Sequence, residues 1–184
     1  RYFELNEEVR WFGGGIDLTP HYVDEQDASY FHQELKRVCD QYSAEFYPKF
    51  KDWADNYFFI KHREETRGIG GIFYDKLTPQ KAGISDQEIF DFSCDLGHLF
   101  PKVYSELVNI NRDKPFTEVE KKWQLLRRGR YVEFNLVYDA GTKFGLETNG
   151  RIESILMSFY NFQPGAGSNE EKTMSLLKKG INWA

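Results

Sequence analysis

Cysteine is scarce in this chain, whose 184 residues include only Cys39 and Cys94. Neither has a second cysteine close by in the sequence. The sequence therefore predicts neither a disulfide framework nor a zinc site built from cysteines, and we expect a reducing environment.

Long apolar runs and an excess of positive charge are also missing. No stretch approaches the ~20 apolar residues that cross a bilayer, so we expect no transmembrane segment. The formal net charge of −5 gives no general field for attracting nucleic acid. We expect no nucleic-acid partner, and an anionic ligand would need a local cluster of arginines. Without repeats, low-complexity tracts or linkers, residues 1–184 are expected to form one domain.

Five helices are expected from the spacing of apolar residues and from helix-start signals. Apolar residues recur every three or four positions from Asp24 to Tyr42 and again from Phe46 to Tyr57. Three capping boxes, each with a glutamate three residues after the first position, begin the other helices at Ser85, Thr117 and Ser168. Pro101 is expected to kink or divide the helix that follows Ser85.

Two longer segments alternate in the manner of β-strands. They run from Arg130 to Tyr138 and from Arg151 to Ser158, and Asn149-Gly150 before the second is a hairpin signal. Shorter strands are expected at Tyr2–Glu4 and Gly70–Tyr74. The sequence thus predicts an α+β fold, with a large and mainly antiparallel sheet flanked by helices on both faces.

The run from Trp11 to Pro20 is the most informative part of the sequence. It combines three consecutive glycines with a single acid, Asp17. Consecutive glycines tolerate positive φ and let the backbone approach a flat partner closely, and Asp17 is the charged group available to address that partner. A tight bend next to a core tryptophan is an equally good interpretation of this run alone.

Two further segments place charged side chains next to glycines, one from Lys61 to Gly71 and one from Tyr138 to Leu146. In the first, guanidinium groups beside a glycine-rich entry into a strand could bind carboxylates, although the spacing is not that of a phosphate-binding loop. In the second, Asp139 and Lys143 lie at an expected turn. For both segments the alternative is a solvated loop held by salt bridges.

Four motifs in chain order resemble the oxygen-dependent coproporphyrinogen III oxidases of haem biosynthesis. They are WFGGGIDLTP, HREETRGIGGIFYD, LRRGRYVEFNLVYD and GTKFGLETNGRIESILMS. The resemblance extends from Arg1 almost to Ala184. Members of this family carry a further segment before the equivalent of Arg1, with a histidine assigned as a proton donor. We therefore expect this chain to be truncated at its N-terminal side and to lack part of the active site.

The resemblance implies an oxidoreductase that converts two propionate groups of coproporphyrinogen III to vinyl groups. The product would be protoporphyrinogen IX, with O2 as the oxidant and no other cofactor required. Asp17 is expected to accept hydrogen bonds from pyrrole N–H groups, and Asp139 is the second expected catalytic acid. The expected substrate-binding residues are Arg1, Arg67, Lys143, Asn149, Gly150 and Arg151. The expected location is the cytoplasm, with the mitochondrial intermembrane space as the alternative.

A divalent cation is assigned to four histidines in bacterial members of the family, and His32 and His62 match two of them. His32 also lies on the apolar face of its expected helix, which favours a histidine satisfied within the core. His62, beside Arg63 and Arg67, is placed to orient a carboxylate.

The chain departs from the family pattern in two places. Ala140 stands where most members have arginine, which would leave Asp139 without an obvious partner and the substrate with one cation fewer. The connection between Ser158 and Tyr160 is shorter than in relatives. An alternative function is therefore a tetrapyrrole-binding or dimer-forming relative with impaired catalysis.

A homodimer is expected through residues 131–158. The segment from Tyr131 to Tyr138 carries apolar side chains on both faces of its expected strand, more than one sheet face can bury, and the resemblance implies dimerisation through the same region. The expected contact residues are Tyr131, Phe134, Leu136 and Ile155.

Overall fold

The structure is a computed structural model that describes residues 1–6, 8–156, 165–169 and 171. The chain divides into two compact units, Arg1–Asp139 and Ala140–Ala184, and each is described by itself. No helix in the described part of the chain has both the length and the apolar character needed to cross a membrane.

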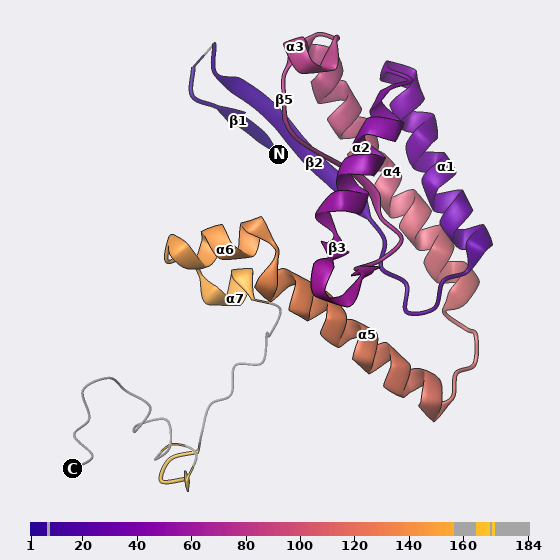
Figure 1. Cartoon of the computed structure of the whole chain (residues 1–184), viewed down its shortest axis with the longest axis vertical. Coiled ribbons are helices and arrows are strands. Elements are labelled where there is room, and N and C mark those ends of the chain that lie inside the picture. Colours follow the sequence, from indigo (N-terminus) through magenta and orange to yellow (C-terminus); the bar gives the residue numbers. More distant parts are fainter. Residues whose placement is uncertain (7, 157–164, 170, 172–184) are drawn as a thin grey trace. The chain divides into compact units, whose positions relative to one another are not determined.

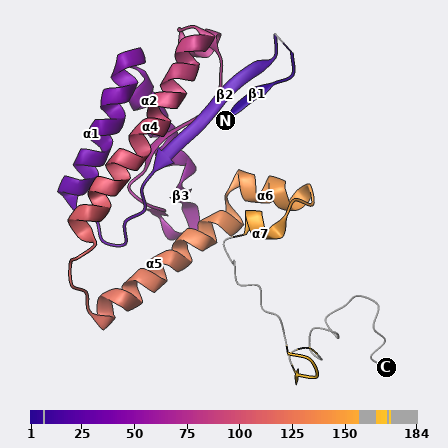
Figure 2. The same cartoon turned by 180° about the vertical axis from the view of Figure 1, so that it is seen from behind.

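The first unit contains a three-stranded antiparallel sheet in the order β1-β2-β5 (Figures 1 and 2). Its strands are β1 (Tyr2–Glu4), β2 (Arg10–Asp17) and β5 (Gly71–Leu77). Both short strands expected from the sequence are confirmed. The glycine run forms a strand, so a tight bend was the wrong interpretation, and its glycines do not have positive φ.

Helices α1 (Glu25–Tyr42), α2 (Phe46–Tyr57) and α4 (Asp86–Asn111) pack against one face of the sheet (Figure 1). Apolar residues from these helices and from both long strands form one core, with Ile72 and Tyr74 supplied by β5. The sequence predicted all three helices from their apolar spacing and start signals, and the expected capping box at Ser85 is present.

Helix α4 continues through Pro101, contrary to the expected division. Proline removes a backbone hydrogen bond from a helix interior and crowds the preceding turn. Leu99 and Val103 on either side are buried in the core, so packing on both sides of the proline offsets that loss. Shorter elements complete this region: the two-stranded sheet β3 (Phe59–Ile60) and β4 (Glu65–Thr66), the 3-10 helix η1 (Lys61–Arg63) and α3 (Pro79–Ala82).

The strand expected from Arg130 to Tyr138 is wrong, because these residues belong largely to helix α5 (Glu118–Val137). The capping box expected at Thr117 is present, and once a helix has started, each further residue adds a hydrogen bond without a new nucleation step. The apolar pattern also fits a helix, since aromatic residues recur at three- and four-residue steps at positions 131, 134 and 138.

The second unit contains α6 (Ala140–Glu147) and α7 (Ile152–Ile155). The strand expected from Arg151 to Ser158 is wrong in its described part, which is helical, whereas Met157 and Ser158 lie outside the described residues. Asn149, with a φ of 55°, marks a turn between two helices and not a hairpin.

Packing inside the second unit explains this turn. A Cβ atom built on Gly145 would lie 3.0 Å from the Ile155 side chain, and one built on Gly150 would lie 2.9 Å from it. Both glycines therefore make room for that side chain. The connection from Ser158 to Tyr160 lies outside the described residues. The backbone N–H of Glu171 donates to Ser168 Oγ at 3.1 Å, as the third expected capping box requires, but the residues after Glu171 are outside the described part.

The α+β class is confirmed. The large sheet flanked by helices on both faces is not found among the described residues, where the strands form one three-stranded and one two-stranded sheet. The difference arises because the two long segments expected as strands are helical wherever they are described.

Candidate functional site

The face of the sheet that lies opposite the core is lined with glycine along β2. Successive residues of a strand point to opposite faces, and the neighbours of the three glycines follow this rule. A Cβ on Gly14 would lie 2.8 Å from Tyr74 Oη on the core side, whereas a Cβ on Gly15 would lie 2.8 Å from the Phe73 ring on the other side. Gly15 is exposed. The glycines therefore allow close packing within the chain, and of the three only Gly15 is exposed, since Gly13 is buried and Gly14 half-buried.

An ion pair lies at one end of this glycine face. Arg1 NH2 is 3.2 Å from Asp75 Oδ1. Both side chains cover Gly13, where an added Cβ would come within 2.8 Å of each. Arg1 remains more than half exposed, with 55% of its side-chain surface accessible, so a ligand on this face could reach its guanidinium.

A second ion pair joins Asp17 to Arg67 at the other end of the face. The two have very different exposure, since the Arg67 side chain is 6% exposed and that of Asp17 28%. The Arg67 guanidinium lies 4.1 Å from the centre of the Phe58 ring and 4.3 Å from that of Tyr131, and its NH1 donates to Asn135 Oδ1 at 3.4 Å. A buried, aromatic-lined cation thus fixes a partly exposed carboxylate.

The glycines that follow Arg67 bring it to this position. A Cβ on Gly68 would lie 2.3 Å from the carbonyl oxygen of Leu18, and one on Gly71 would lie 2.0 Å from that of Ile16. No side chain fits at such distances, so only glycine lets this segment run directly beside the end of β2. The glycine-rich entry into a strand that the sequence predicted therefore serves to place Arg67 next to Asp17.

A second polar cluster connects η1 to α5. Glu133 accepts two hydrogen bonds from Arg63, at 2.7 and 2.8 Å, and contacts His62 Nε2 at 2.5 Å. These bonds hold the pKa of the Glu133 carboxyl below its usual range, with the His62 bond as the main cause. The expectation that His62 orients a carboxylate thus agrees with this geometry.

Asp139 has a partner that the sequence did not indicate. Tyr57 donates its hydroxyl hydrogen to Asp139 Oδ1 at 2.9 Å. The expectation that Ala140 leaves Asp139 without an obvious partner is therefore wrong. The sequence did not indicate Tyr57, Glu133, Asp75 or Asn135 as members of these clusters. No local pattern predicts contacts such as Tyr57–Asp139 and His62–Glu133, whose partners are 82 and 71 positions apart in the chain.

The other four predicted substrate-binding residues belong to the second unit. Lys143 lies in α6, and Arg151 is the residue before the first turn of α7. Both are exposed cations. Asn149 and Gly150 form the turn between the two helices, so this stretch presents positive charge beside a tight turn.

The two histidines expected to bind a metal use both ring nitrogens in hydrogen bonds. His32 Nε2 donates to the carbonyl oxygen of Ile69 at 2.9 Å, and its Nδ1 accepts from Tyr47 at 3.0 Å. His62 contacts Tyr138 and Glu133. Within the described residues no group of three or more histidine, cysteine, aspartate or glutamate side chains could hold a metal ion. Both rings are thus engaged by groups of this chain, His32 in the manner of a satisfied core histidine, and the metal site stays a prediction.

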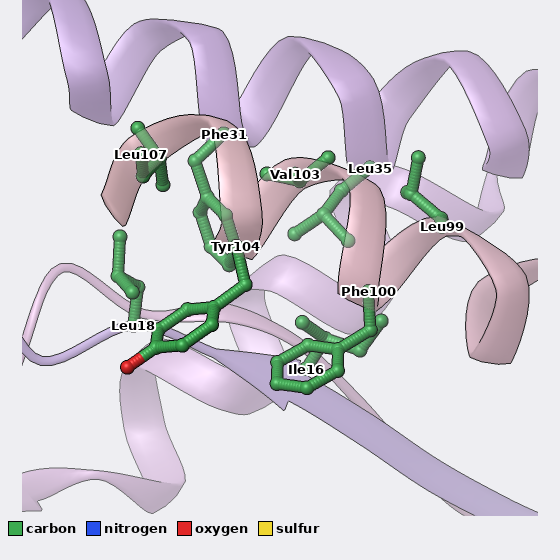
Figure 3. A pocket seen from close by; sticks show the side chains of 9 residues that line it. All are labelled: Ile16, Leu18, Phe31, Leu35, Leu99, Phe100, Val103, Tyr104 and Leu107. Atoms are coloured by element: carbon green, nitrogen blue, oxygen red, sulfur yellow. The ribbon is translucent and has the colours of Figure 1, made fainter. Parts of the chain in front are cut away.

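An apolar hollow with about 250 Å³ of empty space, open solvent included, lies between α1, α4 and the end of β2 (Figure 3). It is lined by Ile16, Leu18, Phe31, Leu35, Leu99, Phe100, Val103, Tyr104 and Leu107. None of these side chains is charged. A ligand with several carboxylates would find no cation here, so the glycine face is the better candidate for such a ligand.

Comparisons with known proteins agree on one family. Residues 1–183 match the family model for coproporphyrinogen III oxidase. The chain is 50% identical over 196 residues to the human mitochondrial oxygen-dependent coproporphyrinogen-III oxidase, 48% over 195 residues to the Drosophila melanogaster enzyme of that name, and 45% over 182 residues to the one from Francisella tularensis.

These alignments cover 100%, 100% and 95% of this chain, but only 42%, 49% and 58% of the respective relatives. The chain therefore spans about half the length of the relatives it matches. A match over nearly every residue, at this identity, establishes that the chain belongs to the coproporphyrinogen III oxidase family.

Proposed function

We propose that the protein containing this chain oxidatively decarboxylates two propionate groups of coproporphyrinogen III to vinyl groups, giving protoporphyrinogen IX. Each propionate loses CO2, a proton and two electrons, and O2 accepts the electrons. Family membership supports this reaction, and no cofactor beyond O2 is part of the proposal.

The observation that carries the proposal is the Asp17 carboxylate, which Arg67 fixes at the end of β2, two residues from the exposed Gly15. A flat tetrapyrrole could lie over Gly15 and donate its pyrrole N–H groups to Asp17. A fixed negative charge next to a ring that is losing electrons stabilises the positive charge that develops on it. Asp17 is therefore assigned the main catalytic role.

Exposed cations in each of the two units are candidates for binding the substrate's carboxylates. Arg1 lies over Gly13, four residues along β2 from Asp17, which corresponds to about 13 Å of strand. It is exposed enough to bind one carboxylate at that end of the face. Lys143 and Arg151 are further exposed cations in the second unit, where Asn149 and Gly150 complete the predicted substrate-binding turn.

Turnover by the full-length protein tests the proposal directly. Coproporphyrinogen III would be supplied with O2, and the product would be oxidised to protoporphyrin and measured by fluorescence. Formation of protoporphyrin supports the proposal, and its absence in a folded protein contradicts it.

Ala140 favours a second candidate, a relative that binds tetrapyrroles but is impaired in catalysis, because the family's usual arginine is missing there. Binding of coproporphyrin III without turnover would support this candidate. Recovery of turnover in the Ala140→Arg variant would then identify the missing arginine as the cause.

We also propose a homodimer formed through α5. Apolar side chains at Leu125, Val132 and Leu136 recur along one side of this helix and are 56%, 37% and 54% exposed. Burying such a stripe against a second copy would remove it from water. Phe134 is fully buried inside the first unit, and Tyr131 contacts Arg67, so Leu136 is the best interface residue of those expected.

Light scattering of the full-length protein at low micromolar concentration tests this assembly. Leu136→Glu should shift a dimer towards monomer, because it places a charge in the apolar contact. The exposed α4 residue Lys102 offers a control, and Lys102→Glu should leave the dimer intact. A wild-type monomer would contradict the proposal. Ile155 packs on the two glycines of the second unit and is only half-buried, so it stays a predicted contact.

A further inference from the structure

The segment between β4 and β5, residues 67–70, belongs to neither strand, so its position depends on individual hydrogen bonds. Two of these bonds join it to the end of β2. The N–H of Ile69 donates to the carbonyl oxygen of Leu18 at 3.0 Å, and the N–H of Leu18 donates to that of Gly70 at 3.1 Å. Because Leu18 directly follows Asp17, these bonds tie the segment to the backbone beside the proposed catalytic carboxylate.

Helix α1 also holds this segment, through the ring of His32. Its Nε2 lies 2.9 Å from the carbonyl oxygen of Ile69, which can only accept, so Nε2 carries a hydrogen. In the neutral ring Nδ1 then accepts from the Tyr47 hydroxyl of α2 at 3.0 Å. The ring also lies edge-on to those of Phe31 and Tyr47, at 5.5 and 6.2 Å. Two hydrogen bonds and two aromatic neighbours therefore fix the orientation of His32.

These contacts form a continuous path of hydrogen bonds from α2 to the residue after Asp17. The path passes through Tyr47, His32, Ile69 and Leu18. Arg67, two residues before Ile69, pairs with the Asp17 side chain itself. Displacement of Ile69 would therefore disturb both the backbone next to Asp17 and the guanidinium that holds its carboxylate.

We propose that His32 and Tyr47 are positioning residues, which hold the segment of residues 67–70 and through it keep the Asp17 carboxylate in the orientation that turnover requires. Catalysis depends steeply on the placement of the reacting groups, so a small shift of this carboxylate is costly. The proposal rests on the function proposed above and adds to it two residues that act through Asp17.

Hydrogen exchange of the full-length protein, followed by mass spectrometry of its peptides, is the first test. His32→Leu removes both bonds and keeps an apolar side chain, so peptides from residues 66–71 should exchange at least about tenfold faster. His32→Gln should restore slow exchange, because its amide can donate to Ile69 in place of Nε2. Peptides from residues 92–103 of α4, which report on the core, should exchange as in the wild type. Unchanged exchange at residues 66–71, or equal acceleration in α4, would overturn the proposal.

Turnover of coproporphyrinogen III is the second test. His32→Leu should lower kcat about tenfold and leave KM nearly unchanged, since the exposed cations that bind carboxylates are intact. His32→Gln should recover most of this loss, and Tyr47→Phe should show a smaller loss of the same kind. Tyr42, another half-buried tyrosine, donates to Asp95 at 2.6 Å and offers the matched control. Tyr42→Phe loses a comparable hydrogen bond and should keep the wild-type kcat. A wild-type kcat in folded His32→Leu would overturn the proposal.

A double-mutant cycle with Asp17 separates positioning from a general effect on the fold. In an Asp17→Asn background, His32→Leu should lower kcat by less than about twofold, because a residue that acts through this carboxylate has no charge left to position. The full tenfold loss in that background would show that His32 does not act through Asp17, and it would overturn the proposal while leaving the proposed function intact.

A folded wild-type protein without turnover would contradict the proposed function instead. The exchange measurement then decides whether His32 anchors the segment. Local acceleration in His32→Leu, reversed in His32→Gln, would still support the anchoring of residues 67–70, and the absence of acceleration would overturn it.

Discussion

Tyr57 donates a hydrogen bond of 2.9 Å to Asp139, across 82 positions of the chain. The contact joins the end of α2 to the second residue after α5 and gives Asp139 a neutral donor. Ala140, at the position where we expect most family members to have arginine, offers this acid no cation, so a tyrosine hydroxyl is one group that orients it.

Removal of that hydroxyl tests the contact. Tyr57→Phe should lower the free energy of unfolding by about 1 to 3 kcal/mol, because a half-buried carboxylate loses a hydrogen-bond donor. Adding Ala140→Arg to this variant should recover part of the loss by giving Asp139 a neighbouring cation. Urea unfolding of the wild type, of each single variant and of the double variant measures both effects. Equal stability of Tyr57→Phe and wild type would show that the bond contributes nothing.

Asp17→Asn should lower kcat by at least ~100-fold in the full-length enzyme, the low end of what a positioned acid or base contributes. The substitution keeps the shape of the side chain and removes the charge that accepts pyrrole N–H groups. In this variant Arg67 would be buried without its anion. The stability of the Asp17→Asn protein must therefore be measured alongside turnover. Wild-type kcat in a folded Asp17→Asn protein would remove Asp17 from the catalytic assignment.

The close packing of the glycine run against the core can be tested through stability alone. Gly14→Ala would place a Cβ 2.8 Å from Tyr74 Oη, in a buried site where Tyr74 also contacts Ser93 Oγ at 2.9 Å. We expect a loss of about 1 to 3 kcal/mol, the usual cost of overpacking.

Gly97 in α4 is the matched control for this substitution. A Cβ there meets no atom within 4 Å, so Gly97→Ala should stabilise the protein by about 0.5 to 1 kcal/mol through helix propensity. Chemical denaturation of both variants gives the comparison. If Gly14→Ala proved as stable as wild type, close packing at β2 would be excluded.

The sequence was most informative where structure depends on neighbouring residues. The capping boxes at Ser85 and Thr117 join atoms three residues apart, and both begin helices as predicted. The segment from Arg130 to Tyr138 was misassigned because it is only nine residues long. Its apolar residues match both the two-residue repeat of a strand and the 3.6-residue repeat of a helix. The segment is helical because it continues the helix that begins upstream at Glu118.

Members of the candidate site were easier to predict than their contacts. Asp17 and Arg67 were both singled out from their glycine-rich surroundings, but their mutual ion pair joins residues 50 positions apart. The Tyr131 ring beside Arg67 was equally hidden, because the strand assignment gave that ring a different environment. Such pairings are fixed by tertiary packing, which no local spacing encodes.

Glu133 should make the stability of the first unit depend on pH. Its pKa in the folded protein lies below the ordinary 4.5, chiefly because of the bond to His62, and the Arg63 bonds act in the same direction. A carboxyl with a lowered folded pKa stabilises the fold above its unfolded pKa, and this contribution disappears as the pH falls through the folded value. The Glu133 contribution should therefore be complete near neutral pH and decline below 4.5.

Thermal unfolding of Glu133→Gln and wild type, at about pH 6 and about pH 3, measures this contribution. The variant should have the lower Tm at the higher pH, and the gap should narrow in acid, where the wild-type carboxyl is protonated and no longer accepts charge-assisted bonds. Glu106→Gln, at an exposed position of α4, controls for the general loss of a negative charge and should show no such narrowing. A Tm gap that stays constant across this range would mean that the bonds from His62 and Arg63 do not stabilise the ionised form, and the contact between η1 and α5 would then have to depend on the aromatic packing around Phe134 instead.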